Sequence, residues 1–77
     1  MKIEVLGTGC AKCITLEKVV KEAVAKSGKF AQVEKVDDIM KIMEYQVIST
    51  PGLVIDGKVV STGKVLSVDE VLAFINN

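Results

Sequence analysis

The sequence contains no histidine and no tryptophan, and only 4% of its residues are aromatic. Without histidine, the chain lacks the commonest general base and the commonest zinc ligand of proteins. Acidic and basic residues balance at ten each, which argues against a nucleic-acid partner held by phosphate neutralisation. The basic residues are spread along the chain and form no cluster typical of a membrane-surface patch.

Long apolar runs are also missing. No stretch approaches the roughly 18–20 apolar residues of a transmembrane helix, so no membrane partner is expected. The N-terminal segment carries an acid at Glu4 and turns over at Gly7, too soon for a signal peptide. We therefore expect a cytoplasmic protein. In that compartment, paired cysteines are more often catalytic or metal-binding than structural.

The remaining composition suits one small domain. The chain has 77 residues, 49% of them hydrophobic, which predicts a single domain over residues 1–77. Lys2 to Leu6 alternates as a strand does, and a helical stripe begins at about Ala11 and ends near Gly28. Phe30 to Val36 is predicted to be a second strand, with Val33 turned inward and Phe30 and Val36 as further candidates for the inward face.

The second half predicts a short helix, a hairpin and a final helix. Asp37 or Asp38 can cap the short helix, and we expect Met40 and Met43 to fill the core beneath it. Later signals are an Asp-Gly hairpin turn and a Ser-x-x-Glu capping box. These signals give strands over residues 52–55 and 58–61, a turn at 56–57, and a helix over 68–75 with its cap at 67–70.

The resulting order is strand, helix, strand, helix, strand, strand, helix. The first three elements form a βαβ unit, so the first two strands should be parallel with a right-handed crossover. The hairpin then adds an antiparallel pair. We therefore predict an α/β fold (βαβαββα), with a four-stranded mixed sheet and three helices that cover both faces.

Cys10 and Cys13 are the residues with the clearest chemical potential. They lie three positions apart where the first strand gives way to the first helix. With Cys10 at the cap, and Gly9 giving the backbone freedom, its sulfur can swing toward Cys13. Helix N-terminal N–H groups and the helix dipole should lower the pKa of Cys10. This predicts that Cys10 attacks and that Cys13, on the apolar face, resolves the mixed disulfide.

Three other interpretations stay open. Two thiolates suit Cu(I), so Cys10 and Cys13 could serve a soft-metal binding or carrier domain, although such domains end in a strand. The two cysteines could instead be inert core residues. In a third interpretation, the chain is an interaction domain whose docking surface includes Met40, Met43 and Tyr45.

A single proline stands at the start of a predicted interior strand. Pro51 follows Thr50 there, and proline is tolerated only at the first residue of such a strand. We predict a cis Thr50–Pro51 bond. It would turn the backbone groups of Thr50 outward beside the cysteines, where an extended substrate segment could pair with them.

These motifs together resemble the thioredoxin superfamily. The resemblance lies in Cys10-Ala11-Lys12-Cys13, Thr50-Pro51, the segment from Val54 to Val59, and Gly63, in this order. The stretch from Gly7 to Cys13 is most similar to the small redox-active disulfide proteins of bacteria and archaea, which are glutaredoxin-like in size.

The resemblance implies a thiol–disulfide oxidoreductase, a protein disulfide reductase or an electron carrier in electron transport. Cys10 is then the nucleophile, Cys13 the resolving thiol, and Thr50-Pro51 the cis-proline platform. Substrate-binding residues near them would be Thr8, Gly9 and Gly63. No cofactor is implied beyond the redox-active disulfide itself. The implied partners are a protein disulfide substrate and a reductase, with a flavoprotein of the thioredoxin-reductase type as a candidate.

The sequence also departs from well-known family patterns. Gly9 stands where thioredoxins have tryptophan, and Ala11-Lys12 replaces their Gly-Pro between the cysteines. Glutaredoxins have a basic residue upstream of the motif that helps to hold glutathione. Thr8 and Gly9 occupy that stretch here, which weakens the case for glutathione as the reductant.

Overall fold

The computed structural model describes residues 1–76 and has the predicted order of elements. They are β1 (Lys2–Leu6), α1 (Ala11–Ser27), β2 (Gln32–Val36), α2 (Ile39–Glu44), β3 (Gly52–Ile55), β4 (Lys58–Thr62) and α3 (Val68–Ile75). The predicted domain of residues 1–77 includes Asn77, which lies outside the described residues. None of the helices in residues 1–76 is long and apolar enough to cross a membrane.

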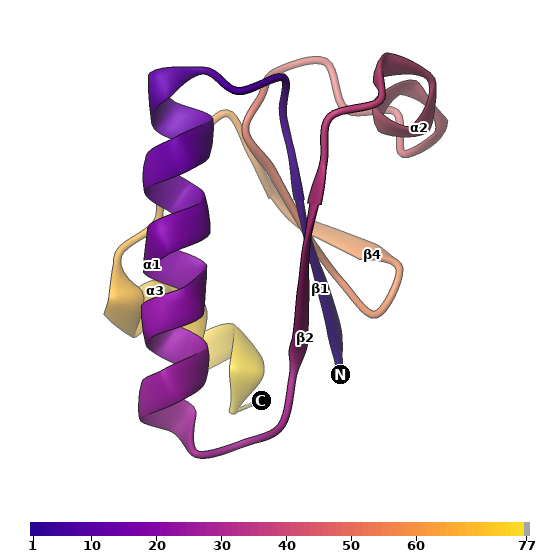
Figure 1. The fold of residues 1–77 in the computed structure, drawn as a ribbon. Helices are drawn as coiled ribbons and strands as arrows, with labels where there is room; N and C mark the ends of the chain where they lie inside the picture. Colours follow the sequence, from indigo (N-terminus) through magenta and orange to yellow (C-terminus); the bar gives the residue numbers. More distant parts are fainter. Residues whose placement is uncertain (77) are drawn as a thin grey trace.

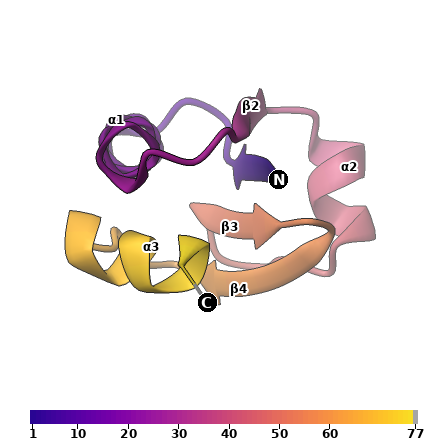
Figure 2. The same ribbon diagram turned by 90° about the horizontal axis from the view of Figure 1, so that it is seen from below.

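The four strands form one mixed sheet in the order β2-β1-β3-β4. β1 runs parallel to β2 and antiparallel to β3, and β3 pairs antiparallel with β4. The helices α1 and α3 cover one face of this sheet and α2 covers the other (Figure 1, Figure 2). The predicted α/β fold and its four-stranded mixed sheet are therefore confirmed.

Local signals explain how several of these elements begin and end. Gly28, with φ 69°, ends α1 in the left-handed conformation that glycine adopts readily. Asp38 caps α2 by accepting a hydrogen bond from the Met40 N–H. Ser67 and Glu70 form the complete capping box at the start of α3.

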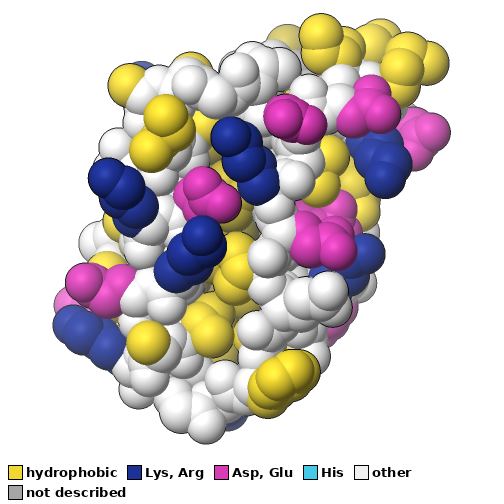
Figure 3. Space-filling view, viewed as in Figure 1, with side chains coloured by type: hydrophobic (Ala, Val, Ile, Leu, Met, Phe, Trp, Pro, Cys, Tyr) yellow, Lys and Arg dark blue, Asp and Glu magenta, His cyan; other side chains and the backbone are white. Residues whose placement is uncertain are grey.

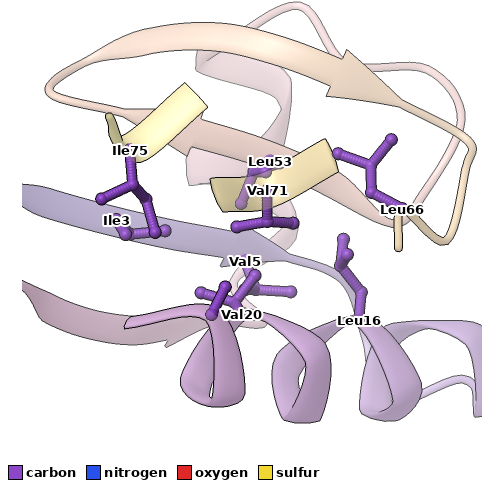
Figure 4. Close-up of a cluster of buried hydrophobic side chains, with 9 residues drawn as sticks. Ile3, Val5, Leu16, Val20, Leu53, Leu66, Val71 and Ile75 are labelled. Atoms are coloured by element: carbon purple, nitrogen blue, oxygen red, sulfur yellow. The ribbon is translucent and has the colours of Figure 1, made fainter. Parts of the chain in front are cut away.

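The larger core lies between the sheet and the helices α1 and α3 (Figure 4). Alternate residues of β1 and β3 face this core, whereas their neighbours face α2. The core cluster consists of Ile3, Val5, Leu16, Val20, Ala23, Leu53, Leu66, Val71 and Ile75. A smaller cluster under α2 consists of Leu6, Val36, Ile42, Val47 and Val54. The first helix is thus held firmly against the sheet, and α1 carries the second cysteine.

Two expectations about the core are wrong. Phe30 is 92% exposed, because the second strand begins only at Gln32, whose N–H donates to Met1 O at the start of the chain. Met40 and Met43 are also exposed, at 69% and 64%. The six-residue helix α2 turns Ile42 inward, and the helical period of 3.6 residues then directs both methionines away from the sheet.

Candidate active site

Cys10 is the N-cap residue of α1. Its backbone is extended (φ −68°, ψ 163°), and its sulfur accepts a hydrogen bond from the Cys13 N–H at 3.2 Å. The Cys10 carbonyl accepts the first helical bond, from the Ile14 N–H at 3.0 Å. Gly9, with φ 89°, lets the chain turn into this cap. A sulfur therefore stands where helix N-termini usually place an oxygen.

The two cysteines form a disulfide, with their Cα atoms 5.0 Å apart. They differ in surroundings: Cys10 is exposed, whereas only 3% of Cys13 is accessible. An incoming thiolate or disulfide can therefore reach the Cys10 sulfur far more easily than the Cys13 sulfur. A thiolate formed at Cys10 would also face the unpaired N–H groups and positive dipole end of α1.

Three chain segments meet at this end of the sheet. Leu6 pairs with Gly52, and Gly52 pairs with Thr62, so the end of β1, the start of β3 and the end of β4 lie together. The loop from β1 to α1 lies at this same end, at the top of Figure 1. The fold thus brings residues near positions 10, 50 and 63 into one neighbourhood.

The Thr50–Pro51 peptide bond is cis. Pro51 is buried and its carbonyl accepts a hydrogen bond from the Gly63 N–H at 2.8 Å. Thr50 is half-buried, and within residues 1–76 no hydrogen bond of its backbone N–H or C=O to another residue is seen. The backbone of Thr50 is therefore available to pair with another chain.

The other predicted substrate-binding residues take different positions. Thr8 and Gly9 are exposed in the loop that precedes Cys10. Gly63 directly follows β4, with φ 71°, and a Cβ there would lie 3.1 Å from the Ser49 Cβ. Gly63 is therefore placed to hold the segment before β3, whereas Thr8 and Gly9 border the exposed sulfur.

Gly7 belongs to this site, although the sequence predicts it only as a turn residue. It is buried at the end of β1, and a Cβ at this position would overlap the Cys13 sulfur. The same Cβ would lie 3.9 Å from the Thr50 Cβ. Gly7 thus lies between the buried cysteine and the segment before β3. The signal in the sequence that could have identified Gly7 as a site residue was its position three residues before Cys10.

An apolar patch adjoins this end of the molecule. Figure 3 shows hydrophobic side chains gathered over α2 at the upper right. The exposed apolar residues of this region are Ile39, Met40, Met43 and Ile48, and Ile48 is 98% exposed. Ile48 lies in the segment between α2 and Thr50. Met40 and Met43 were expected in the core, and their place on an exposed surface was the alternative prediction; Ile39 and Ile48 were not predicted to belong to such a surface.

The α2 face also carries a charged hollow of about 370 Å³, which contains none of the predicted site residues. Glu4 is buried there, and its carboxylate accepts a hydrogen bond from the Tyr45 hydroxyl at 3.0 Å. Lys2 lies 3.9 Å from Glu4 and 3.5 Å from Glu34. The bond to Glu4, together with burial, raises the pKa of Tyr45 above its ordinary value. Tyr45 thereby ties the end of α2 to β1.

The part of the chain that the structure describes holds no group of three or more histidine, cysteine or acidic residues placed to bind a metal ion. Cys10 and Cys13 are the two thiolate ligands that a soft metal could use once their disulfide is reduced.

Comparison with known proteins agrees with this geometry. Residues 1–76 match the sequence profile of a family described as "Thioredoxin domain". A protein named "Thioredoxin" from Methanothermobacter thermautotrophicus is 42% identical over 71 residues, which cover 92% of this chain and 92% of that protein. Another "Thioredoxin", from Methanocaldococcus jannaschii, is 42% identical over 69 residues, which cover 90% of this chain and 79% of that protein. The chain therefore belongs to the thioredoxin domain family, and with its Cys10–Cys13 disulfide this membership supports thiol–disulfide oxidoreductase chemistry.

Proposed function

We propose that this protein is a small protein disulfide reductase or electron carrier that works through the Cys10–Cys13 disulfide. One observation carries the proposal: the two sulfurs form one disulfide at a helix N-terminus, with Cys10 exposed and Cys13 buried. This asymmetry gives the two thiols different tasks. The two archaeal relatives named "Thioredoxin" support the same activity.

The reaction begins with the reduced dithiol. The Cys10 thiolate attacks one sulfur of a client disulfide, forms a mixed disulfide and releases the other client sulfur as a thiolate, which takes up a proton. Cys13 then loses its proton and attacks the Cys10 sulfur, which releases the second client thiolate. The products are a Cys10–Cys13 disulfide and a reduced client, so two electrons pass to the client.

Resolution needs little movement, because the cysteines already lie on one helical turn. The Cα atoms of the pair are 5.0 Å apart, within the usual range of disulfides. The N–H of Cys13 donates to the Cys10 sulfur in the disulfide and would also stabilise the Cys10 thiolate of the reduced protein before it attacks the client. The cap geometry therefore serves the attack by Cys10, and the short distance between the two cysteines serves the resolution by Cys13.

We propose that the client binds as an extended segment beside Thr50 and Pro51. The Thr50 backbone has no hydrogen-bond partner within residues 1–76, and paired backbone groups are how an added strand binds. Thr8 and Gly9 would border the client on the cysteine side. Gly63 would hold the Thr50-Pro51 segment in place, because the Gly63 N–H donates a hydrogen bond to Pro51 O.

The proposal also covers the cell compartment, the cofactor and the reductase. We propose that residues 1–77 act as one domain in the cytoplasm, with no cofactor other than the disulfide. A reductase, of the thioredoxin-reductase type in this proposal, would return electrons to Cys10–Cys13. Glutathione is a weaker candidate, because Thr8 and Gly9 replace the basic residue that helps glutaredoxins to hold it.

The proposal is tested by insulin reduction with dithiothreitol as the electron source. Wild-type protein should accelerate the reduction, and Cys10→Ser should abolish the acceleration. Cys13→Ser should instead accumulate a mixed disulfide with the client, because attack occurs and resolution does not.

Two results would contradict the proposal. Full activity of Cys10→Ser would show that Cys10 is not the nucleophile. Tight stoichiometric Cu(I) binding by the reduced protein, without any exchange activity, would identify a metal carrier instead.

A further inference from the structure

The end of β1 and the buried cysteine make an unusually close contact. Gly7 has no side chain, and a Cβ built on its backbone would overlap the Cys13 sulfur and lie 2.9 Å from the Cys13 Cβ. Carbon atoms that are not bonded normally lie about 3.5–4.0 Å apart. The Cys13 sulfur therefore occupies the space that any other residue at position 7 would need.

Both sides of this contact are held in place. The Gly7 N–H donates to Val36 O at 2.9 Å, and the preceding Leu6 pairs with Gly52 in the β1–β3 ladder. Cys13 lies on α1 next to the turn that buries Leu16 in the larger core. A side chain at position 7 could be accommodated only if the Cys13 side chain moved.

We propose that Gly7 is a positioning residue of the redox pair. Its missing side chain lets the Cys13 sulfur lie where it can bond to Cys10, so Gly7 sets the balance between the disulfide and the dithiol. The inference uses the same two cysteines as the proposed function, but it concerns their equilibrium and needs no client protein. In the reaction, the Cys10–Cys13 bond breaks, each sulfur gains a hydrogen, and a small dithiol is oxidised to its cyclic disulfide.

The direction in which a side chain at position 7 shifts the equilibrium depends on how freely the Cys13 sulfur can move in the disulfide and in the dithiol. In the disulfide, the bond to Cys10 fixes the Cys13 sulfur against residue 7. In the dithiol, a change of rotamer can move the Cys13 sulfur out of that space, whereas the Cys13 Cβ stays close to residue 7 in both states and so does not alter the comparison. Gly7→Ala should therefore destabilise the disulfide more than the dithiol. The effect of the substitution on unfolded-chain entropy cancels, because the redox equilibrium compares two folded forms.

The test is the equilibrium of each protein with oxidised and reduced dithiothreitol, read by trapping free thiols. Gly7→Ala should shift the equilibrium constant toward the dithiol by roughly tenfold, which corresponds to about 30 mV for two electrons. Gly52→Ala is the matched control. A Cβ at Gly52 would also be crowded, at 3.3 Å from Val47 and 3.4 Å from Leu6, but its nearest neighbours are side-chain carbons. It should lower stability without a comparable shift of the equilibrium.

An unchanged equilibrium for Gly7→Ala, a shift toward the disulfide, or an equal shift for Gly52→Ala would overturn the proposal. If Gly7→Ala does not fold, NMR of the wild-type protein replaces it. On reduction, the Gly7 resonances should move more than those of Gly52, and equal or smaller movement would contradict the proposal. A failure of insulin reduction would reject the proposed function but would leave this equilibrium measurable, so the two failures are distinguishable.

Discussion

One face of the sheet lies under α1 and α3, whereas the helix over the other face, among residues 1–76, is the six-residue α2 (Figure 2). The α1 and α3 face holds a continuous apolar core and the buried sulfur of Cys13. The α2 face holds a smaller cluster, the buried Glu4 carboxylate, a charged hollow, and exposed methionines. The difference indicates that packing on the α1 and α3 face holds the two cysteines in position. The α2 face instead leaves apolar side chains exposed to solvent near them.

The largest expected effect is a loss of stability on the first face. Leu16 is fully buried in the larger core, and Leu16→Ala should lower the free energy of unfolding by about 2–5 kcal/mol, in the upper half of that range. Ile42→Ala removes a similar volume under α2, and we expect the lower half of the range because its neighbours can relax toward the hollow. Urea unfolding measures both changes. An equal or larger cost for Ile42→Ala would contradict the difference between the faces.

A smaller effect should follow from uncapping α3. Ser67→Ala should cost about 1 kcal/mol, because the Ser67 side chain satisfies the Glu70 N–H. Hydrogen bonds from Ser67, its backbone N–H first, lower the pKa of the Glu70 carboxyl. A lowered folded-state pKa contributes stability above the unfolded-state pKa, and this stability is lost as the pH falls through the folded-state value.

The predicted loss of folding stability at acid pH can be tested with a matched control variant. Glu70→Gln should flatten the fall of stability with pH in the acid range, because it removes the carboxylate that accepts a hydrogen bond from the Ser67 N–H. Asp69→Asn, at the neighbouring exposed position in the first turn of α3, is the control and should change the slope less. Thermal unfolding at a series of pH values measures the slopes. An unchanged acid slope in Glu70→Gln would show that the capping box does not stabilise the carboxylate.

The smallest effect is expected at the link between α2 and β1. The hydroxyl of Tyr45 donates to Glu4, and this bond raises the pKa of Tyr45. A raised folded-state pKa contributes stability that is present below the unfolded value of about 10 and is lost as the pH rises through the folded-state value. Tyr45→Phe should therefore be slightly less stable at neutral pH and lose less stability in alkali. An equal loss of stability at alkaline pH in Tyr45→Phe and in the wild-type protein would show that the Tyr45–Glu4 hydrogen bond does not contribute to stability.

The sequence predicted those features that depend on local chemistry. Cap residues, the Asp56-Gly57 turn and the helix start at Cys10 each act through the chain beside them, so their positions could be read from residue types and spacing. The parallel pairing of the first two strands followed from the βαβ unit, and the antiparallel pairing of the last two followed from the hairpin turn. Most of the fold and the place of the cysteine pair were therefore predictable.

The features that the sequence did not reveal depend on neighbours distant in the chain. Whether Met40 and Met43 are buried is decided by the direction in which α2 turns Ile42, which no local pattern gives. The role of Gly7 depends on a sulfur that α1 brings back to the end of β1. Phe30 is exposed because its strand begins where β1 offers a partner. Each case depends on tertiary packing.

We infer that the two faces of the sheet and the helix cap give Cys10 and Cys13 different tasks. The most direct test is to react the fully reduced protein with limiting iodoacetamide and to measure the alkylation rate of each cysteine by peptide mass spectrometry. The exposed Cys10 at the helix N-terminus should react much faster than the buried Cys13. Equal rates, or a faster reaction at Cys13, would contradict the assignment of nucleophile and resolving thiol.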